Sequence, residues 1–166
     1  ERAARSQFEA ERETLRQIRS RRIAPATDHK RVASWNGYAI SGLAKAASLL
    51  GDPDLLEEAT RAADFVIERM SDDEGRLLRV YNEGRAQIGA FLDDHASLLD
   101  ACLELHRAGA GDRFLKTGLR TASAITQRFF DPELKDFFFT ASDGEPLAFR
   151  PRSDHDGATP RSEERR

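Results

Sequence analysis

Apolar residues recur every three to four positions between residues 35 and 50, and again between residues 53 and 70. This spacing is typical of amphipathic helices with one buried face. Gly51 suits the left-handed end of the first helix, and Asp52 followed by Pro53 suits the start of the second. The pattern therefore predicts an αα-hairpin with these buried residues: Ala39, Ile40, Leu43, Ala44, Ala47 and Leu50, then Leu55, Leu56, Ala59, Ala62, Ala63, Val66, Ile67 and Met70.

The same pattern returns 59 residues later, which predicts a second pair of helices over Leu92–Ala108 and Asp112–Phe130. A short β-hairpin is expected after each pair, with strands at 77–81 and 85–88 in the first and at 137–140 and 147–150 in the second. A unit of this kind repeated at a fixed period indicates an array of αα-hairpins, so the fold class is mainly α. The matching positions include Leu56 with Leu115, Ala63 with Ala122, Val66 with Ile125, Arg69 with Arg128, Ile40 with Leu99 and Leu43 with Cys102.

Three regions follow from this organisation. Residues 1–22 form a charged amphipathic helix with a thin apolar stripe, residues 23–160 hold the two hairpins, and residues 161–166 form a polar tail. We expect the chain from Asp154 onwards to be disordered. Met70 is the only methionine, and two hairpins alone leave a flank uncovered, so we expect the array to continue beyond both ends of the sequence.

Composition narrows the function classes. The 166 residues carry a formal net charge of −3 and have a pI near 5.9, which provides no basic surface for nucleic acid. No long uncharged apolar run is present, so no membrane span is expected. The single cysteine, Cys102, allows neither an internal disulfide nor a CxxC pair, and this favours a reducing, cytoplasmic location.

Polar and aromatic residues gather just before the first helix of each hairpin. The segment from Pro25 to Gly37 contains Asp28 and Lys30, then Ser34 as the expected N-cap, and Trp35 and Asn36 on the first turn. The 59-residue offset places Ser34, Trp35 and Asn36 on Asp93, Asp94 and His95. In a curved array these helix ends share one rim, where free N–H groups favour polar ligand oxygens.

The rim could perform acid–base chemistry on a sugar. Asp93 and Asp94 are the candidate catalytic carboxylates, and Trp35 could stack on a sugar face. Structural interpretations remain open beside these: Asp93 suits an N-cap, and Trp35 suits the space between hairpins.

Other chemistry finds little support. His29, His95, His106 and His155 include no i, i+4 pair, so we predict no metal site. His106 and Cys102 are expected to pack in the core rather than to react, and no GxGxxG or P-loop glycine pattern is present, so no cofactor is predicted. The run Phe137-Phe138-Phe139 fits a strand edge that covers the helices.

Several motifs, in order, resemble the spermatogenesis-associated protein 20 family of thioredoxin-domain-containing proteins, from about Pro25 to Pro160. They are Pro25, Asp28, Lys30, Trp35-Asn36-Gly37, Gly51-Asp52-Pro53, Phe91-Leu92-Asp93-Asp94, Phe137-Phe138-Phe139-Thr140 and Asp156-Gly157-Ala158-Thr159-Pro160. The sequence departs from the family pattern at His95 and His155, where an aromatic residue is common, and at Arg161-Ser162-Glu163-Glu164, where Ser-Gly-Asn-Ser is usual.

The resemblance implies a parent protein with a thioredoxin-like domain followed by an (α/α)6 toroid similar to six-hairpin glycosidases and N-acylglucosamine 2-epimerases. This chain would hold about two hairpins of that toroid, and its partners would be the remaining hairpins, the thioredoxin-like domain and a carbohydrate-like small molecule. The resemblance implies that Trp35, Asn36, Asp93 and Asp94 line the rim of the cavity. We take as candidate substrate-binding residues Asp28, Lys30, Trp35, Asn36, His95 and Asp156.

Three hypotheses follow. In the first, the intact parent binds and processes a carbohydrate-like ligand in a central cavity. In the second, the toroid is a non-catalytic scaffold coupled to the thioredoxin-like domain. In the third, the chain is a truncated product without a function of its own.

Overall fold

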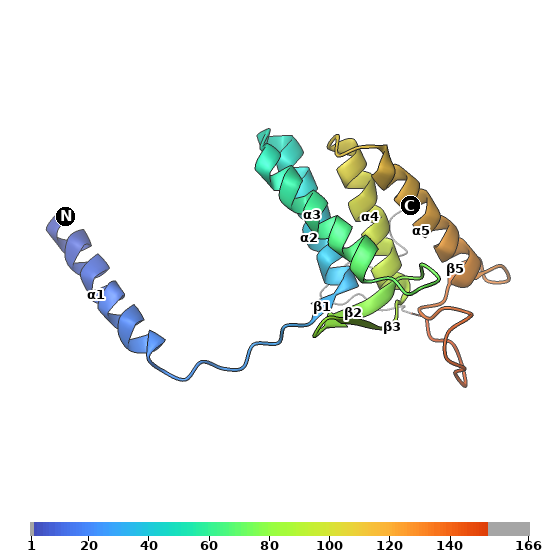
Figure 1. Cartoon of the computed structure of the whole chain (residues 1–166), viewed down its shortest axis with the longest axis horizontal. Helices are drawn as coiled ribbons and strands as arrows, with labels where there is room; N and C mark the ends of the chain where they lie inside the picture. Colours follow the sequence, from blue (N-terminus) through green and yellow to red (C-terminus); the bar gives the residue numbers. More distant parts are fainter. Residues whose placement is uncertain (1, 153–166) are drawn as a thin grey trace.

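The computed structural model describes residues 2–152, and five helices and five short strands lie within that range (Figure 1). Their bounds are α1 Arg2–Ser20, β1 Arg31–Val32, α2 Ala33–Leu50, α3 Pro53–Arg69, β2 Leu78–Asn82, β3 Arg85–Gly89, α4 Leu92–Arg107, α5 Asp112–Arg128, β4 Phe130–Asp131 and β5 Asp136–Phe137. The described part is therefore mainly helical, as the apolar periodicity predicted.

The predicted repeat is present in the helix starts. α2 begins at Ala33 and α4 at Leu92, while α3 begins at Pro53 and α5 at Asp112. Both pairs are separated by the 59 residues that the sequence pattern indicated. The caps between α2 and α3 are also as predicted: Gly51 has φ 65°, and the Asp52 carboxylate accepts hydrogen bonds from the N–H groups of Asp54 and Leu55.

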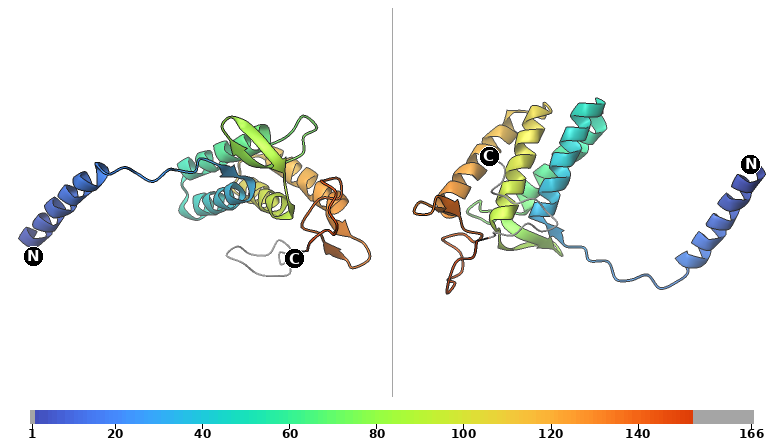
Figure 2. Two further views of the ribbon diagram at one scale, coloured as in Figure 1. Left: turned by 90° about the horizontal axis from the view of Figure 1, so that it is seen from below. Right: turned by 180° about the vertical axis from the view of Figure 1, so that it is seen from behind.

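α2 and α4 lie side by side and run parallel. Gly37 of α2 abuts Ser97 of α4, and one turn further along Ser41 meets Asp100. α3 packs on α2 and α5 packs on α4 (Figure 2), so each hairpin contributes one helix to a central pair and one to its outside. The core between the helices consists of small and branched side chains around two larger ones, Met70 and Phe114. The smaller members include Ile40, Ala44, Ala63, Val66, Ala101 and Leu105.

The first predicted β-hairpin is confirmed to within one residue at each end. β2 and β3 pair antiparallel, with Asn82 opposite Arg85. Glu83 and Gly84 both have positive φ between them, as a tight type I′ turn requires. β1 joins the other edge of β2 through Arg31 and Val32, so this strand leads directly into α2.

The second predicted β-hairpin is wrong. Two-residue strands form instead at Phe130–Asp131 and Asp136–Phe137, and no strand occurs at 147–150. Arginine side chains hold this segment: Arg150 donates to the carbonyl oxygen of Thr140, and the guanidinium groups of Arg150 and Arg152 lie 4.1 and 4.4 Å from the Phe138 ring centre. These contacts replace the expected ladder, so of the three phenylalanines only Phe137 lies in a strand.

The described side chains from residue 5 to residue 31 are all exposed, including Phe8, Leu15 and Ile18 on the apolar stripe of α1. α1 lies apart from the hairpins at the end of an extended segment (Figure 1). No helix within residues 2–152 is long and apolar enough to cross a membrane. The expected disorder of the tail and the candidate residue Asp156 both lie outside the described residues.

Candidate functional site

The Asp94 carboxylate accepts hydrogen bonds from the backbone at the start of α4 and at the start of α2. It is fully buried. One oxygen accepts the Ser34 N–H at 3.0 Å, and the other accepts the Phe91 N–H at 3.0 Å and the Arg79 Nη1 donor at 2.7 Å. The predicted caps are therefore wrong: Ser34 lies buried inside α2 with its N–H bound by the next repeat, and Asp94 at the third position of α4, not Asp93, binds the N-cap backbone.

Burial dominates the ionisation of Asp94. Removal from water raises the pKa of this carboxyl, and the neighbouring charge of Asp93 raises it further. The N–H donors of Phe91 and Ser34 and the Arg79 guanidinium act in the opposite direction. With every oxygen engaged and no exposed surface, Asp94 can influence a ligand only through Asp93 and Arg79.

Asp93 is the carboxylate that faces solvent. Its side chain is 27% exposed, and its two oxygens lie 3.0 and 3.3 Å from Nη1 of Arg79. Arg79 comes from β2, and its guanidinium stacks 4.8 Å from the Phe91 ring centre. One arginine thus orients both acidic residues, with Asp93 presented outward and Asp94 inward.

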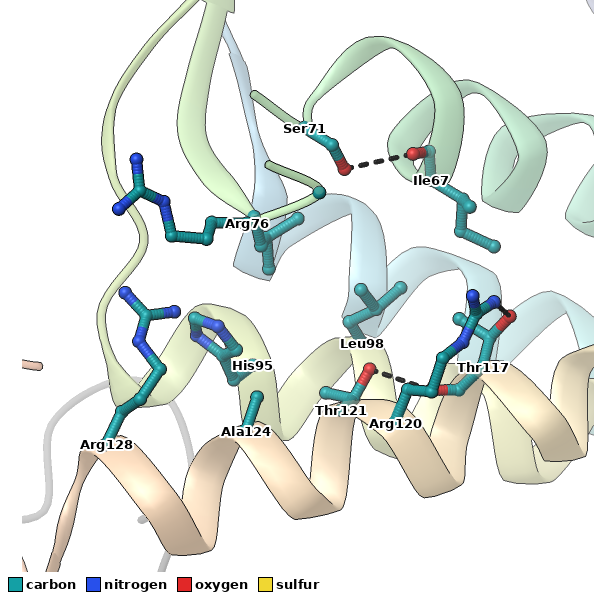
Figure 3. A pocket seen from close by; sticks show the side chains of 12 residues that line it. Ile67, Ser71, Arg76, His95, Leu98, Thr117, Arg120, Thr121, Ala124 and Arg128 are labelled. Carbon is teal, nitrogen blue, oxygen red and sulfur yellow. Dashed lines mark hydrogen bonds between the residues drawn. The ribbon is translucent and has the colours of Figure 1, made fainter. Parts of the chain in front are cut away.

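His95 points the other way. The imidazole is 3% exposed, contacts the Phe129 ring at 5.0 Å between centroids, and places Nδ1 3.0 Å from the Phe91 carbonyl oxygen. Burial lowers its pKa, and the charge of Arg128 lowers it further, so the neutral ring donates from Nδ1 and keeps an acceptor at Nε2. The ring lines a cavity of about 340 Å³ that lies over α4 between α3 and α5 (Figure 3).

The other predicted site residues are more dispersed. Trp35 is 67% exposed on the first turn of α2, while the Asn36 amide donates to the Val32 carbonyl oxygen at 2.8 Å. Asp28 and Lys30 are exposed and form an ion pair of 3.1 Å with each other. Within the described residues neither of these two contacts Asp93 or Asp94, so the structure brings together Asp93 and Asp94 but leaves Asp28 and Lys30 apart.

A second polar cluster lies along the same two helices and was not predicted. Ser41 donates to Asp100 at 2.6 Å, and Nζ of Lys45 lies 3.7 Å from Asp100 and 3.9 Å from Glu104. The 59-residue offset contained the signal: it relates Ser34, Ser41 and Lys45 to Asp93, Asp100 and Glu104, which are polar positions in both repeats. Arg79 was also missed, because its partners are set by the β-hairpin and not by helical spacing.

These polar positions lie on one side of α4. Gly118 of α5 lies against the opposite side, since a Cβ added to it would be 3.5 Å from the Cβ of Cys102. At about 100° per residue, Asp93, Asp100 and Glu104 are roughly opposite Cys102 on the helix. The polar stripe therefore faces away from α5, on the inner side of the α2–α4 pair, whereas His95 faces α5.

The sequence of this chain is similar to part of much longer proteins. No family model matches the sequence. An uncharacterized Caenorhabditis elegans protein is 33% identical over 157 residues, covering 90% of this chain and 21% of that protein. Spermatogenesis-associated protein 20 of Homo sapiens is 32% identical over 158 residues, covering 89% of this chain and 20% of that protein. The chain thus spans about a fifth of the length of these relatives.

Solved structures show a similar fold at low sequence identity. Cellobiose 2-epimerase from Bacillus thermoamylovorans superposes with a TM-score of 0.63 at 12% identity, over 69% of this chain and 33% of that one. A GH76 α-mannanase from Bacteroides thetaiotaomicron gives 0.62 at 12%, over 70% and 33%. Both are (α/α)6 toroids. This chain therefore has the fold of two αα-hairpins of such a toroid, and its sequence is similar to part of spermatogenesis-associated protein 20.

Proposed function

We propose that the longer protein containing this segment binds a carbohydrate in the central cavity of a completed toroid, and that Asp93 transfers a proton there. The observation that carries the proposal is the partly exposed Asp93 carboxylate on the inner side of α4, oriented by Arg79. A positioned carboxylate is a suitable general acid or base for sugar chemistry. The similar toroids act on cellobiose and on α-mannan, which supports a glycan as the ligand class.

The other residues take distinct roles in this proposal. Trp35 offers an exposed indole face for stacking on a sugar ring, and Ser41, Lys45 and Glu104 offer hydroxyl-binding groups further along the inner wall. Asn36, Lys30 and Asp28 would contribute from the rim, and Asp156 remains a candidate from the sequence alone. Asp94 is a positioning residue, because its buried oxygens hold Arg79 and the starts of both inner helices.

The remaining hairpins are the proposed partners. On α2, Leu49 is 86% exposed, and nothing lies within 4 Å of a Cβ added to Gly42. One repeat later, on α4, the position of Gly42 is taken by Ala101, which α2 covers and which is 0% exposed. We infer that the parallel first helix of a preceding hairpin covers this edge of α2, as α2 covers α4.

The test uses the longer protein with all its hairpins. Isothermal titration with cellobiose and with α-mannooligosaccharides should show that Asp93→Asn and Glu104→Gln each weaken binding about tenfold, which corresponds to about 1.4 kcal/mol. Asp112→Asn, an exposed carboxylate on the outer helix α5, is the matched control and should bind like the unaltered protein. Equal affinity in all three variants would remove the inner wall from the site.

The scaffold alternative differs in one measurable respect. A non-catalytic toroid beside a thioredoxin-like domain would bind neither sugar, while Asp93→Asn would leave the association between the two domains unchanged. Incubating the longer protein with cellobiose and following the anomeric and C2 protons by NMR separates binding from turnover, because an epimerase changes the C2 configuration and a hydrolase releases monosaccharide.

A further inference from the structure

We propose that the cavity between α3 and α5 is a second ligand site, and that it takes a small polyol carrying one phosphate or carboxylate group. This site is independent of the sugar-binding proposal, because it lies on the opposite side of α4 from Asp93. Its volume of about 340 Å³ falls at the lower end of the range usual for small-molecule pockets. The walls come from the end of α3, the loop before β2, and the facing sides of α4 and α5.

Three guanidinium groups surround the cavity (Figure 3). Arg76 and Arg128 lie together at one end, where Asp72, Glu74 and Asp143 bind them. Arg120 lies at the other end and donates to the Thr117 hydroxyl at 3.2 Å. No carboxylate within the described residues contacts Arg120, so the positive charge at this end is uncompensated. A guanidinium with spare N–H donors favours a phosphate or carboxylate oxygen there.

The cavity also offers hydrogen-bond acceptors. The hydroxyl groups of Ser71, Thr117 and Thr121 each donate to the backbone carbonyl oxygen four residues earlier, at 3.0 Å. The oxygens of Ser71 and Thr121 therefore remain as acceptors, while that of Thr117 already accepts from Arg120. His95 is 3% exposed and projects into the same space, and with Nδ1 on the Phe91 carbonyl its Nε2 is a further acceptor. Acceptors in this number suit a ligand that brings several hydroxyl donors.

The first repeat differs from the second repeat at a position that lines this cavity. Arg61 and Arg69 occupy the positions of Arg120 and Arg128, but Phe65 occupies the position of Ala124, which lines the cavity. The Phe65 ring packs against Tyr81 at 5.0 Å between centroids. Ala124 leaves that volume open, and this difference between the repeats supplies matched variants for a test.

The test measures binding to the full 166-residue chain by isothermal titration at 0.15 M salt. The probes are glucose 6-phosphate, gluconate, glucose and inorganic phosphate. We expect the two anionic polyols to bind at least tenfold more tightly than glucose and than phosphate alone. Arg120→Gln should weaken glucose 6-phosphate binding at least tenfold, whereas Arg61→Gln, its counterpart one repeat earlier, should have no effect. Thr121→Val keeps the shape of the wall, removes one acceptor, and should weaken binding several-fold.

Other outcomes overturn the proposal. Equal losses from Arg120→Gln and Arg61→Gln would show non-specific attraction between charges. Phosphate binding as tightly as glucose 6-phosphate would show an anion site without polyol recognition. Ala124→Phe should fill the cavity and abolish binding while circular dichroism shows an intact helical fold; if a folded Ala124→Phe variant still binds, the ligand sits elsewhere. If Ala124→Phe does not fold, the comparison of Thr121→Val with the unaltered chain decides the same question.

Discussion

Ser41 on α2 donates a 2.6 Å hydrogen bond to Asp100 on α4, the residue at the equivalent position one repeat later. The neighbouring contacts have nearly the same separation, since the Ser34 N–H binds Asp94 and Gly37 lies against Ser97. Each first helix therefore meets the next in parallel and in register. Parallel helices that repeat this contact can build the inner wall of a toroid, with Ser41 and Asp100 contributing polar groups to it.

The close approach of α2 and α4 depends on Gly37. A Cβ at this position would lie 2.7 to 2.8 Å from Ser97, including its backbone carbonyl carbon. We expect Gly37→Ala to lower the free energy of unfolding by about 2 kcal/mol, because the two helices must separate. Gly42→Ala is the matched control: nothing lies within 4 Å of its Cβ, and the change should stabilise α2 by about 0.5 kcal/mol. Urea denaturation followed by circular dichroism measures both, and shifts of the same sign would contradict the packing.

Asp94 should be a determinant of stability. Both of its oxygens accept hydrogen bonds, from two backbone N–H groups and the Arg79 guanidinium, so Asp94→Asn places an amide N–H₂ against an N–H or guanidinium donor. We expect this substitution to lower the free energy of unfolding by about 2 to 3 kcal/mol. Asp112→Asn removes an 83% exposed carboxylate and should change it by less than about 0.5 kcal/mol. A loss below 1 kcal/mol for Asp94→Asn would show that the hydrogen bonds at this carboxylate are not needed.

His95 should make the fold sensitive to mild acid. Its pKa is lowered in the folded chain by burial, so below the ordinary value of 6.5 the unfolded chain takes up the proton first. Stability is therefore complete above pH 6.5 and falls as the pH drops from there, by at most about 1.4 kcal/mol per pH unit. Urea midpoints between pH 8 and 5.5 should show a smaller loss for His95→Gln than for the exposed-residue control His29→Gln. Identical slopes would mean that His95 is protonated equally easily in both states.

Cys102 should react only when the chain unfolds. The thiol is fully buried, and burial raises its pKa to about 11. At pH 8 we expect a disulfide reagent such as DTNB to modify Cys102 at least about a hundredfold more slowly than an exposed cysteine introduced by Ser123→Cys in a Cys102→Ala background. The two rates should converge in concentrated urea. Comparable rates without urea would show that this part of the core opens frequently.

The sequence by itself determined the local elements and their period. The bounds of the four hairpin helices to within two residues, the Gly51 and Asp52 caps, the first β-hairpin and the 59-residue repeat follow from apolar spacing and from hydrogen bonds within a few residues. The burial of Cys102 was also predicted, because its counterpart Leu43 has the apolar spacing of a core position. These features depend on neighbours along the chain, which the sequence displays directly.

Only the tertiary structure decided the direction of each rim side chain and the partner that it contacts. The partner of the Ser34 N–H is 60 residues away, and Arg79 reaches Asp93 and Asp94 from a strand. Adjacent residues of one helix diverge by about 100°, so Asp93 faces the inner side, Asp94 is buried, and His95 faces the outer cavity. The second hairpin failed as a prediction for the same reason: Arg150 and Arg152 hold that segment through contacts across the chain that local patterning does not encode.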